Sequence, residues 1–365
     1  MADEAANRAA FRIQQHYCAT NQAPIYARMC GAVAEHLRAD TPLGARILGW
    51  PGEPTRDALP LRFFGGLHAL VQAGADGELA EVYAGRITDE AAIGAIVNRV
   101  ARDHGAMLMP WLDGPPQTNE PGRSAALMLG LLEIARRHGP RIEIVEIGSS
   151  GGLNLLIGAY RFDLGGTMVG PADAPVTMAP RWTGAPAPVV PITIERARGC
   201  DVAPRDVTDP AVAARLAAYV WPDTPQRLER LRRVIAMARE RGVRVDRADA
   251  ADWIEARLAE PQEPGVARVL MHSVVWQYLP DATADRVRAA MEAAGTRATA
   301  ERPVGWVAME PDRALAHQVV RVRSWPGHGD WRACAFTHAH GTWIDTAMEK
   351  AAAPVVLPDS ARVTL

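Results

Sequence analysis

The sequence predicts an α/β protein in which a mostly parallel sheet, ending in an antiparallel hairpin, follows an N-terminal helical domain. Three observations predict it. Residues 1–138 carry apolar residues at helical spacing, and later residues alternate between strand-like and helical segments. Between them, Ile142–Leu155 (IEIVEIGSSGGLNL) reads as a strand, a glycine turn and a helix. We therefore expect an all-helical domain at 1–138 and an α/β domain at 139–365.

The spacing of apolar residues in the N-terminal part predicts a series of helices. Two fit before residue 40, separated near Asn21–Pro24, and proline and glycine in residues 41–60 indicate a loop. Further helices are expected at 61–73, 76–84 and 89–103.

A polar segment, Gln117–Arg123, precedes the first strand and opens a long helix through Arg137. Thr118 or Asn119 could cap that helix. Alternatively, the segment overhangs a ligand pocket and closes it from the helical domain, which would then act as a substrate cap. The residues predicted to contact a substrate on this view are Gln117, Asn119, Glu120 and Arg123.

The α/β part is taken as one sheet with an insertion. A short helix is expected at 153–160, and the glycine- and proline-rich residues 161–191 predict an insertion that contains a hairpin. The later expected strands are 192–196, 243–247, 266–275 and 305–309, then a hairpin of 319–322 with 334–337; the expected helices are 209–219, 225–241, 251–259 and 281–294.

Polar residues fall at the ends of these strands. In parallel sheets ligands bind at the carboxyl ends of the strands, so this coincidence is the strongest functional signal in the sequence. The residues concerned are Glu146, Asp201, Asp249, His272 and Glu310.

Composition excludes several classes of function. A net charge of −2 over 365 residues argues against a general nucleic-acid surface. No run approaches about 18 apolar residues, and the start lacks the apolar core of a signal peptide. Four widely spaced cysteines predict neither structural zinc nor a disulfide framework. Lys350 is the only lysine and follows no glycine-rich loop, which argues against a P-loop. We expect a cytoplasmic protein without nucleic-acid or membrane partners, and no pattern fixes its oligomeric state.

The order of polar groups suits S-adenosylmethionine (SAM). Such a site needs an acid near the end of the first strand, then a glycine turn. A second acid, after the next strand, binds both ribose hydroxyls because a carboxylate can accept two hydrogen bonds. A third polar group meets the adenine amino group. Glu146 with Gly148–Gly152, then Asp201, then Asp249 supply these groups in order.

Two motifs carry a resemblance to a known family. EIGSSGGLN resembles motif I of class I SAM-dependent methyltransferases, which have a Rossmann-like sheet, and GCDVAP resembles their second motif. Ser150 stands where motif I more often has glycine. The cofactor-binding residues that this resemblance implies are Glu146, Gly148, Ser149, Ser150, Gly151, Gly152, Asn154, Asp201, Asp249 and Ala250.

Nearly the whole chain resembles a bacterial family known as domain of unknown function 2332. The segments concerned are FFGGLHAL, QTNEPGR, EIGSSGGLNLL, GCDVAPRDV, VWPDTPQRLERL and VLMHSVVWQYLP. This resemblance implies a methyltransferase-like fold and no particular substrate.

Methyl transfer to a small-molecule acceptor, by in-line attack on the sulfonium methyl, is therefore the expected function. His272, near the end of its strand, is the candidate general base, and Trp276 and Tyr278 are candidates for the wall of the substrate pocket. A structural histidine and core aromatic residues are the alternative interpretation of the same positions.

Four other functions stay open. The chain could bind SAM or another nucleotide without catalysis. It could be a serine hydrolase, with Ser150 in G-x-S-x-G, Asp312 and a later histidine. Dinucleotide binding fits less well, because G-x-G-x-x-G is absent. A metal held by His338 and His340 is possible as an accessory feature.

Overall fold

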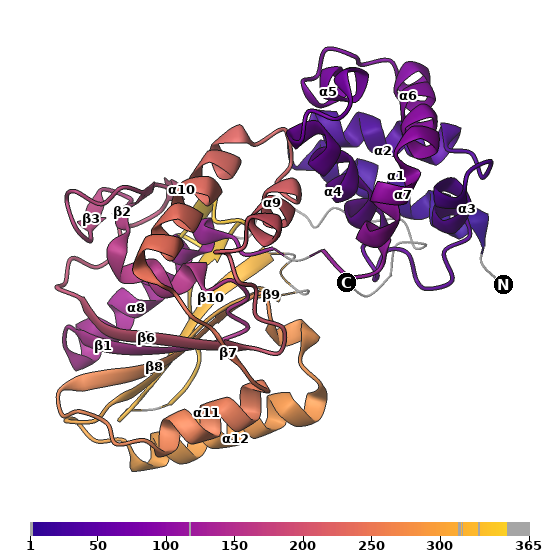
Figure 1. Ribbon diagram of the computed structural model, residues 1–365. Coiled ribbons are helices and arrows are strands. Elements are labelled where there is room, and N and C mark those ends of the chain that lie inside the picture. Colours follow the sequence, from indigo (N-terminus) through magenta and orange to yellow (C-terminus); the bar gives the residue numbers. More distant parts are fainter. Residues whose placement is uncertain (1–2, 117, 313–314, 316, 328, 349–365) are drawn as a thin grey trace. The chain divides into compact units, whose positions relative to one another are not determined.

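The structure is a computed structural model that describes residues 3–116, 118–312, 315, 317–327 and 329–348 (Figure 1). The chain forms two compact units. One holds the residues up to Thr118 together with Pro210–Glu229, and the other holds Asn119–Asp209 and the described residues from Arg230 onward. The division therefore differs from the expected boundary at residue 138, because the last helix before the sheet belongs to the sheet unit.

The first unit is helical, as expected. Its helices, including one 3₁₀ helix (η1), are α1 (Glu4–Thr20), α2 (Pro24–His36), α3 (Pro42–Leu48), α4 (Leu59–Gln72), α5 (Gly77–Tyr83), α6 (Glu90–Asp103), α7 (Gly105–Leu108), η1 (Met109–Leu112) and α9 (Pro210–Ala218). The predicted loop at 41–60 is wrong in part. Thr41 caps α3 by accepting the Gly44 amide, and Pro42 stands at the first helical position, two start signals that the proline and glycine content concealed.

The second unit is built on a large sheet. Among the described residues its strands follow the order β5-β12-β11-β10-β9-β8-β1-β6-β7, nine in all. They are β1 (Arg141–Ile147), β5 (Arg181–Thr183), β6 (Thr193–Asp201), β7 (Asp246–Arg247), β8 (Val266–Ser273), β9 (Val304–Asp312), β10 (His317–Trp325), β11 (Arg332–Thr337) and β12 (Trp343–Asp345). The neighbouring strands β7, β6, β1, β8 and β9 are parallel. The strands β9, β10, β11 and β12 pair antiparallel, each with the next.

The strand order reverses beside β1. The chain passes from β1 to β6 and β7 on one side, and then to β8 and β9 on the other. In doubly wound sheets this reversal opens a crevice at the carboxyl ends of the strands, where ligands bind. The α/β class and the mostly parallel sheet are confirmed.

Helices cover both faces of the sheet (Figure 1). On one face lies α8 (Ser124–His138), where Gly130 lets the helix approach Val307 of β9. On the other lie α11 (Ala250–Ala259) and α12 (Asp281–Arg297). There Val145 and Ile147 of β1 share a core with Leu270 of β8 and with both helices. Because side chains alternate along a strand, Glu146 faces α8, whereas His272 faces α11 and α12.

The predicted insertion, residues 161–191, contains four short strands. Its strands β2 (Arg161–Leu164), β3 (Thr167–Val169) and β4 (Thr177–Met178) form a small sheet. Its last strand, β5, instead joins the large sheet beside β12, a pairing that no sequence pattern predicts. The expected strand at 243–247 shrinks to the two residues of β7.

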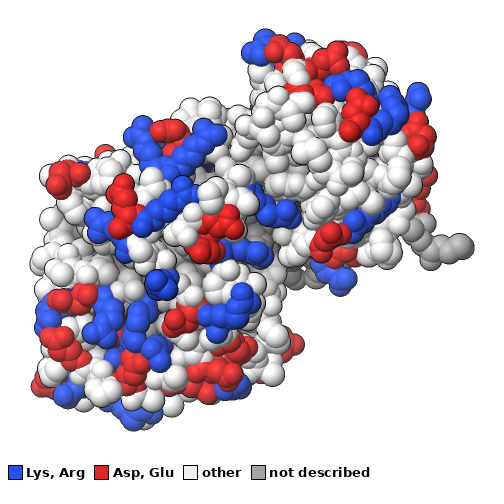
Figure 2. All heavy atoms as spheres, in the orientation of Figure 1, with Lys and Arg blue, Asp and Glu red and all other residues white. Residues whose placement is uncertain are grey.

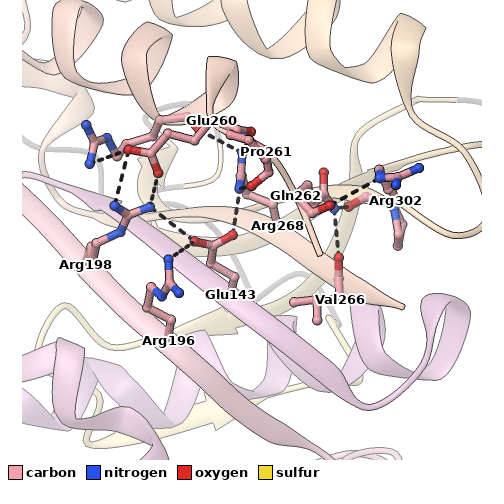
Figure 3. A network of polar contacts seen from close by, with 11 residues as sticks. Glu143, Arg196, Arg198, Glu260, Pro261, Gln262, Val266, Arg268 and Arg302 are labelled. Carbon is pink, nitrogen blue, oxygen red and sulfur yellow. Dashed lines mark hydrogen bonds and ion pairs between the residues drawn. The ribbon is translucent and has the colours of Figure 1, made fainter. Parts of the chain in front are cut away.

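A network of ion pairs around the buried Glu143 carboxylate lies at the amino-terminal end of the sheet (Figure 3). The Glu143 carboxylate of β1 accepts from Arg268 Nε of β8 at 2.8 Å, and Arg198 of β6 joins Glu143 to Glu260. These charges lie at the end of the strands opposite the glycine turn.

Within the described ranges, no helix combines the length and apolar character that a membrane crossing requires. On the face shown in Figure 2, basic and acidic side chains are interspersed.

Candidate functional site

The glycine turn after β1 has a left-handed backbone at three positions. The φ angles are 70° at Gly148, 52° at Ser150 and 73° at Gly152. The Ser149 amide donates to the Cys200 carbonyl at 3.0 Å, which joins the turn to β6. A Cβ on Gly148 would lie 2.3 Å from Val275 Cγ2, so glycine is required there both by φ and by packing.

Asp201 lies beside this turn, as the sequence predicted. Its Oδ2 accepts from the Ser150 amide at 2.9 Å, and its Oδ1 accepts from the Ala203 amide at 2.8 Å. Because each carboxylate oxygen has two lone pairs, each keeps one for a ligand. Asp201 thus helps to hold the turn and still has the capacity to bind hydroxyl groups.

Asn119 brings the polar segment to the glycine turn. Its Oδ1 accepts from the Leu153 amide at 2.9 Å, at the start of the 3₁₀ helix η3 (Leu153–Ala159). The predicted capping role is not observed: the 3₁₀ turn η2 (Pro121–Arg123) precedes α8, which begins only at Ser124. Gln117 lies outside the described residues.

Glu120 and Arg123 are buried in the same segment. Glu120 Oε1 accepts from the Gly122 amide at 2.9 Å and from Arg230 Nη2 at 3.0 Å. Arg123 Nε donates to the Ala339 carbonyl at 2.9 Å. Sequence reasoning missed Arg230, because one arginine in the arginine-rich helix α10 (Pro225–Arg241) carries no distinguishing signal.

Glu146 is the most unusual charge of the site. It is 2% exposed, and its Oε2 has no hydrogen-bond partner among the described residues. Burial raises the pKa of Glu146 to about 7, although the side chains of Ser149 and Asn154 offset part of the effect. Asn154 is also buried, and its Oδ1 likewise has no partner within the described chain. Two such acceptors can receive a ligand that carries hydrogen-bond donors.

His272 does not meet Glu146, because the two side chains point to opposite faces of the sheet. Trp306 Nε1 donates to His272 Nε2 at 2.9 Å, and His272 Nδ1 lies 2.7 Å from Glu310 Oε1. An indole N–H can only donate, so Nε2 accepts, and the proton on Nδ1 is donated in a hydrogen bond to Glu310 Oε1. With both nitrogens engaged, His272 has no free lone pair for a substrate proton in this arrangement. Its catalytic role stays a prediction that this geometry does not favour.

The two aromatic candidates differ in environment. Trp276 stacks on His272 with ring centroids 5.1 Å apart, and the Arg288 guanidinium lies over the Trp276 ring, 5.1 Å from its centroid. Tyr278 is 73% exposed. Trp276 therefore packs in the layer of α12, and Tyr278 extends into solvent.

Asp249 caps α11. Its Oδ1 accepts from the amides of Ala251 and Asp252, and its Oδ2 lies 3.3 Å from the Thr283 hydroxyl. Ala250 is the first residue of that helix. Both residues stand at the carboxyl edge, where their cofactor role remains a prediction.

The groups named for the hydrolase and metal alternatives are not arranged as those alternatives require within the described chain. There, no histidine hydrogen bonds the Ser150 hydroxyl, and Asp312 instead pairs with Arg321. Within the same residues, no group of three His, Cys, Asp or Glu side chains is placed to hold a metal ion.

The helical unit has a groove of its own, with a volume of about 610 Å³. None of the predicted site residues lines this groove. Among its lining residues are Arg8, His36, Arg38, Asn98 and Arg102.

Comparison with known proteins yields one family. The family model of DUF2332, described as an uncharacterized protein conserved in bacteria, matches residues 8–346. No curated protein and no solved structure matches the chain.

Proposed function

The chain belongs to this bacterial family, domain of unknown function 2332, and we propose that it transfers a methyl group from SAM to a small-molecule acceptor. The observation that carries the proposal is the meeting of the glycine turn with Asp201 at the point where the strand order reverses. There the Asp201 carboxylate binds the Ser150 amide, so a ligand that touches the turn also reaches an acid on the neighbouring strand.

The residues of this edge fit SAM. The buried Glu146 Oε2, which has no partner among the described residues, offers an acceptor to the cationic end of the cofactor. Asp201 keeps one lone pair on each oxygen for the ribose hydroxyls. Val202 follows Asp201 and is 69% exposed, which gives the adenine ring an apolar surface. Asp249 and Ala250 remain the proposed contacts at the edge of the base.

When bound, the cofactor supplies an activated methyl group, so the chain needs mainly to bind and orient the reactants. Asn119, Glu120 and Arg123 are buried polar residues beside the turn, and we assign them to the acceptor side of the pocket. His272 is not used as a base in this proposal, because both of its nitrogens are engaged.

Calorimetric titration tests the proposal. The purified protein is titrated separately with SAM, its demethylated product, NAD and ATP. Micromolar binding of SAM, without binding of NAD or ATP, supports the cofactor assignment. An acceptor that then gains a methyl group, detected by mass spectrometry, supports the reaction. No SAM binding overturns the proposal, and labelling of Ser150 by a fluorophosphonate would then favour the hydrolase.

A second candidate function is binding of SAM or another nucleotide without catalysis. The engagement of both His272 nitrogens favours it, because His272 is then not available as a base. SAM binding without turnover on a broad panel of acceptors would support this candidate.

A further inference from the structure

The loop that follows β8 has a strained backbone. Val274 has a φ of 53°, in the left-handed region. For a β-branched side chain this conformation is costly, and it persists only where the surroundings hold it. The groups that hold this loop are therefore informative about the neighbouring site.

Two hydrogen bonds hold the loop to β9. The Val274 amide donates to the Met309 carbonyl at 3.0 Å, and the Val275 amide donates to Glu310 Oε1 at 3.1 Å. The first is backbone pairing, which any sequence could make. The second depends on the Glu310 side chain.

Glu310 is itself held in place by a chain of donors. His272 Nδ1 donates to the same Oε1 at 2.7 Å, and Trp306 Nε1 donates to His272 Nε2 at 2.9 Å. His272 and Trp306 are each 2% exposed, so both hydrogen bonds are shielded from water. The carboxylate that receives the Val275 amide is thus fixed by two buried rings.

The loop in turn forms one wall of the glycine turn. Val275 Cγ2 occupies the space that a Cβ on Gly148 would need, at a separation of 2.3 Å. A shift of the Val274–Val275 backbone would therefore change the space above the turn that a ligand must enter.

We infer that Glu310 is a positioning residue of the glycine-turn site: oriented by His272, it holds the Val274–Val275 loop against Gly148. This assigns to His272 and Trp306 a role in orienting Glu310, and to Glu310 a role in shaping the pocket without touching the ligand. The inference rests on the proposed function only where its test measures SAM affinity.

A double-mutant cycle tests it. Glu310→Ala removes the acceptor, whereas Glu310→Gln keeps an oxygen at the same place. Val274→Asn relieves the strain, because asparagine tolerates a positive φ. Glu260→Ala is the control, since it removes an ion-paired carboxylate of the same unit at the opposite end of the sheet. The first readout is SAM affinity, and the second is amide hydrogen exchange of residues 148–152 and 274–276 without ligand.

We expect E310A to weaken SAM binding about tenfold, and E310Q and E260A to leave it within about twofold. In the V274N background, the cost of E310A should fall to about threefold or less, because the loop no longer needs to be held against strain. Exchange should accelerate in both segments in E310A and stay near the wild-type rate in E310Q.

Equal costs of E310A in the wild-type and V274N backgrounds would overturn the inference, and so would unchanged exchange at 148–152. Should E310A fail to fold, Val275→Ala removes the wall and keeps the network. It should accelerate exchange at 148–152 but not at 274–276, and no acceleration at 148–152 would also count against the inference. If the wild type binds no SAM, the proposed function fails, while the exchange data still decide this inference.

Discussion

Glu146 is the residue whose protonation should be visible in the stability of the whole protein. Burial raises its pKa from 4.5 to about 7. The folded state therefore binds a proton that the unfolded state has released between these pH values. The resulting stabilisation is complete below pH 4.5 and is lost as the pH rises to about 7.

Glu146→Gln should remove this pH dependence, because an amide does not titrate. The loss between pH 4.5 and 7 is about 3 kcal/mol at most, from about 1.4 kcal/mol per pKa unit. Urea unfolding at pH 5 and pH 8 measures it, with Glu240→Gln as an exposed control. An equal pH slope in wild type and E146Q would contradict the assignment.

Asp201 serves both the turn and the proposed cofactor. Asp201→Ala should weaken SAM binding by roughly 2–3 kcal/mol, because two ribose hydrogen bonds are lost and the Ser150 amide loses its acceptor. The matched control is Asp163→Ala, since Asp163 also accepts a turn amide, from Gly166 at 2.8 Å, in the insertion. Calorimetry with both variants decides the case, and equal SAM affinity in D201A and wild type would remove Asp201 from the cofactor site.

At the scale of the element, the glycine turn combines a left-handed backbone with close packing. Gly148 and Gly242 have similar φ angles, 70° and 61°, but only Gly148 has a neighbour that a Cβ would strike. Gly242 has nothing within 4 Å of such a Cβ. Alanine substitutions at Gly148 and at Gly242 therefore separate the free-energy cost of a left-handed φ angle from the free-energy cost of the packing clash.

Both glycine-to-alanine variants should lose the roughly 1–2 kcal/mol that a left-handed residue costs. Gly148→Ala should lose about 1–3 kcal/mol more through overpacking against Val275. Thermal and urea unfolding of G148A, G242A and G148A/V275A measure the two terms. The clash is refuted as the cause if V275A recovers none of the additional loss.

At the scale of the whole molecule, a buried ion pair lies at the end of the sheet opposite the proposed cofactor site. The buried pair Glu143–Arg268 lies at the amino-terminal end of the sheet (Figure 3), with side chains 8% and 3% exposed. Glu143→Gln leaves Arg268 without its counter-charge, so unfolding free energy should fall by about 3–5 kcal/mol.

The double variant E143Q/R268M should recover much of this loss, because no uncompensated charge remains buried. SAM affinity of each folded variant should equal that of the wild type. Urea unfolding and calorimetry on the same preparations compare the two effects. A change in affinity that follows the change in stability would contradict the separation of the two ends.

Much of the architecture was predictable because its signals are local. The spacing of apolar residues located most of the helices, from α1 to α12, and the β-branched run before Gly148 located β1. Asp201 was predicted beside the glycine turn from its place at the end of β6, and the structure brings the two together. A βαβ pattern already implies that the strands pair in parallel. Parallel pairing brings the carboxyl ends of the strands to one edge of the sheet, so polar residues at those ends are expected to meet there.

Local sequence patterns are therefore enough to predict the α/β class, the helical N-terminal part, the order of the elements and the residues at the strand ends. Which of those residues meet depends on how the strands pair and how the helices pack. The alternation of side chains along each strand, together with the pairing of the strands, directs Glu146 toward α8 and His272 toward α12. An error of one residue in a predicted strand register would place each side chain on the opposite face of the sheet. The pairing of β5 with β12, the contact of Asn119 with Leu153 and the orientation of Glu310 by His272 join residues far apart in the chain. Local patterns cannot encode these contacts, because they exist only once the sheet is assembled.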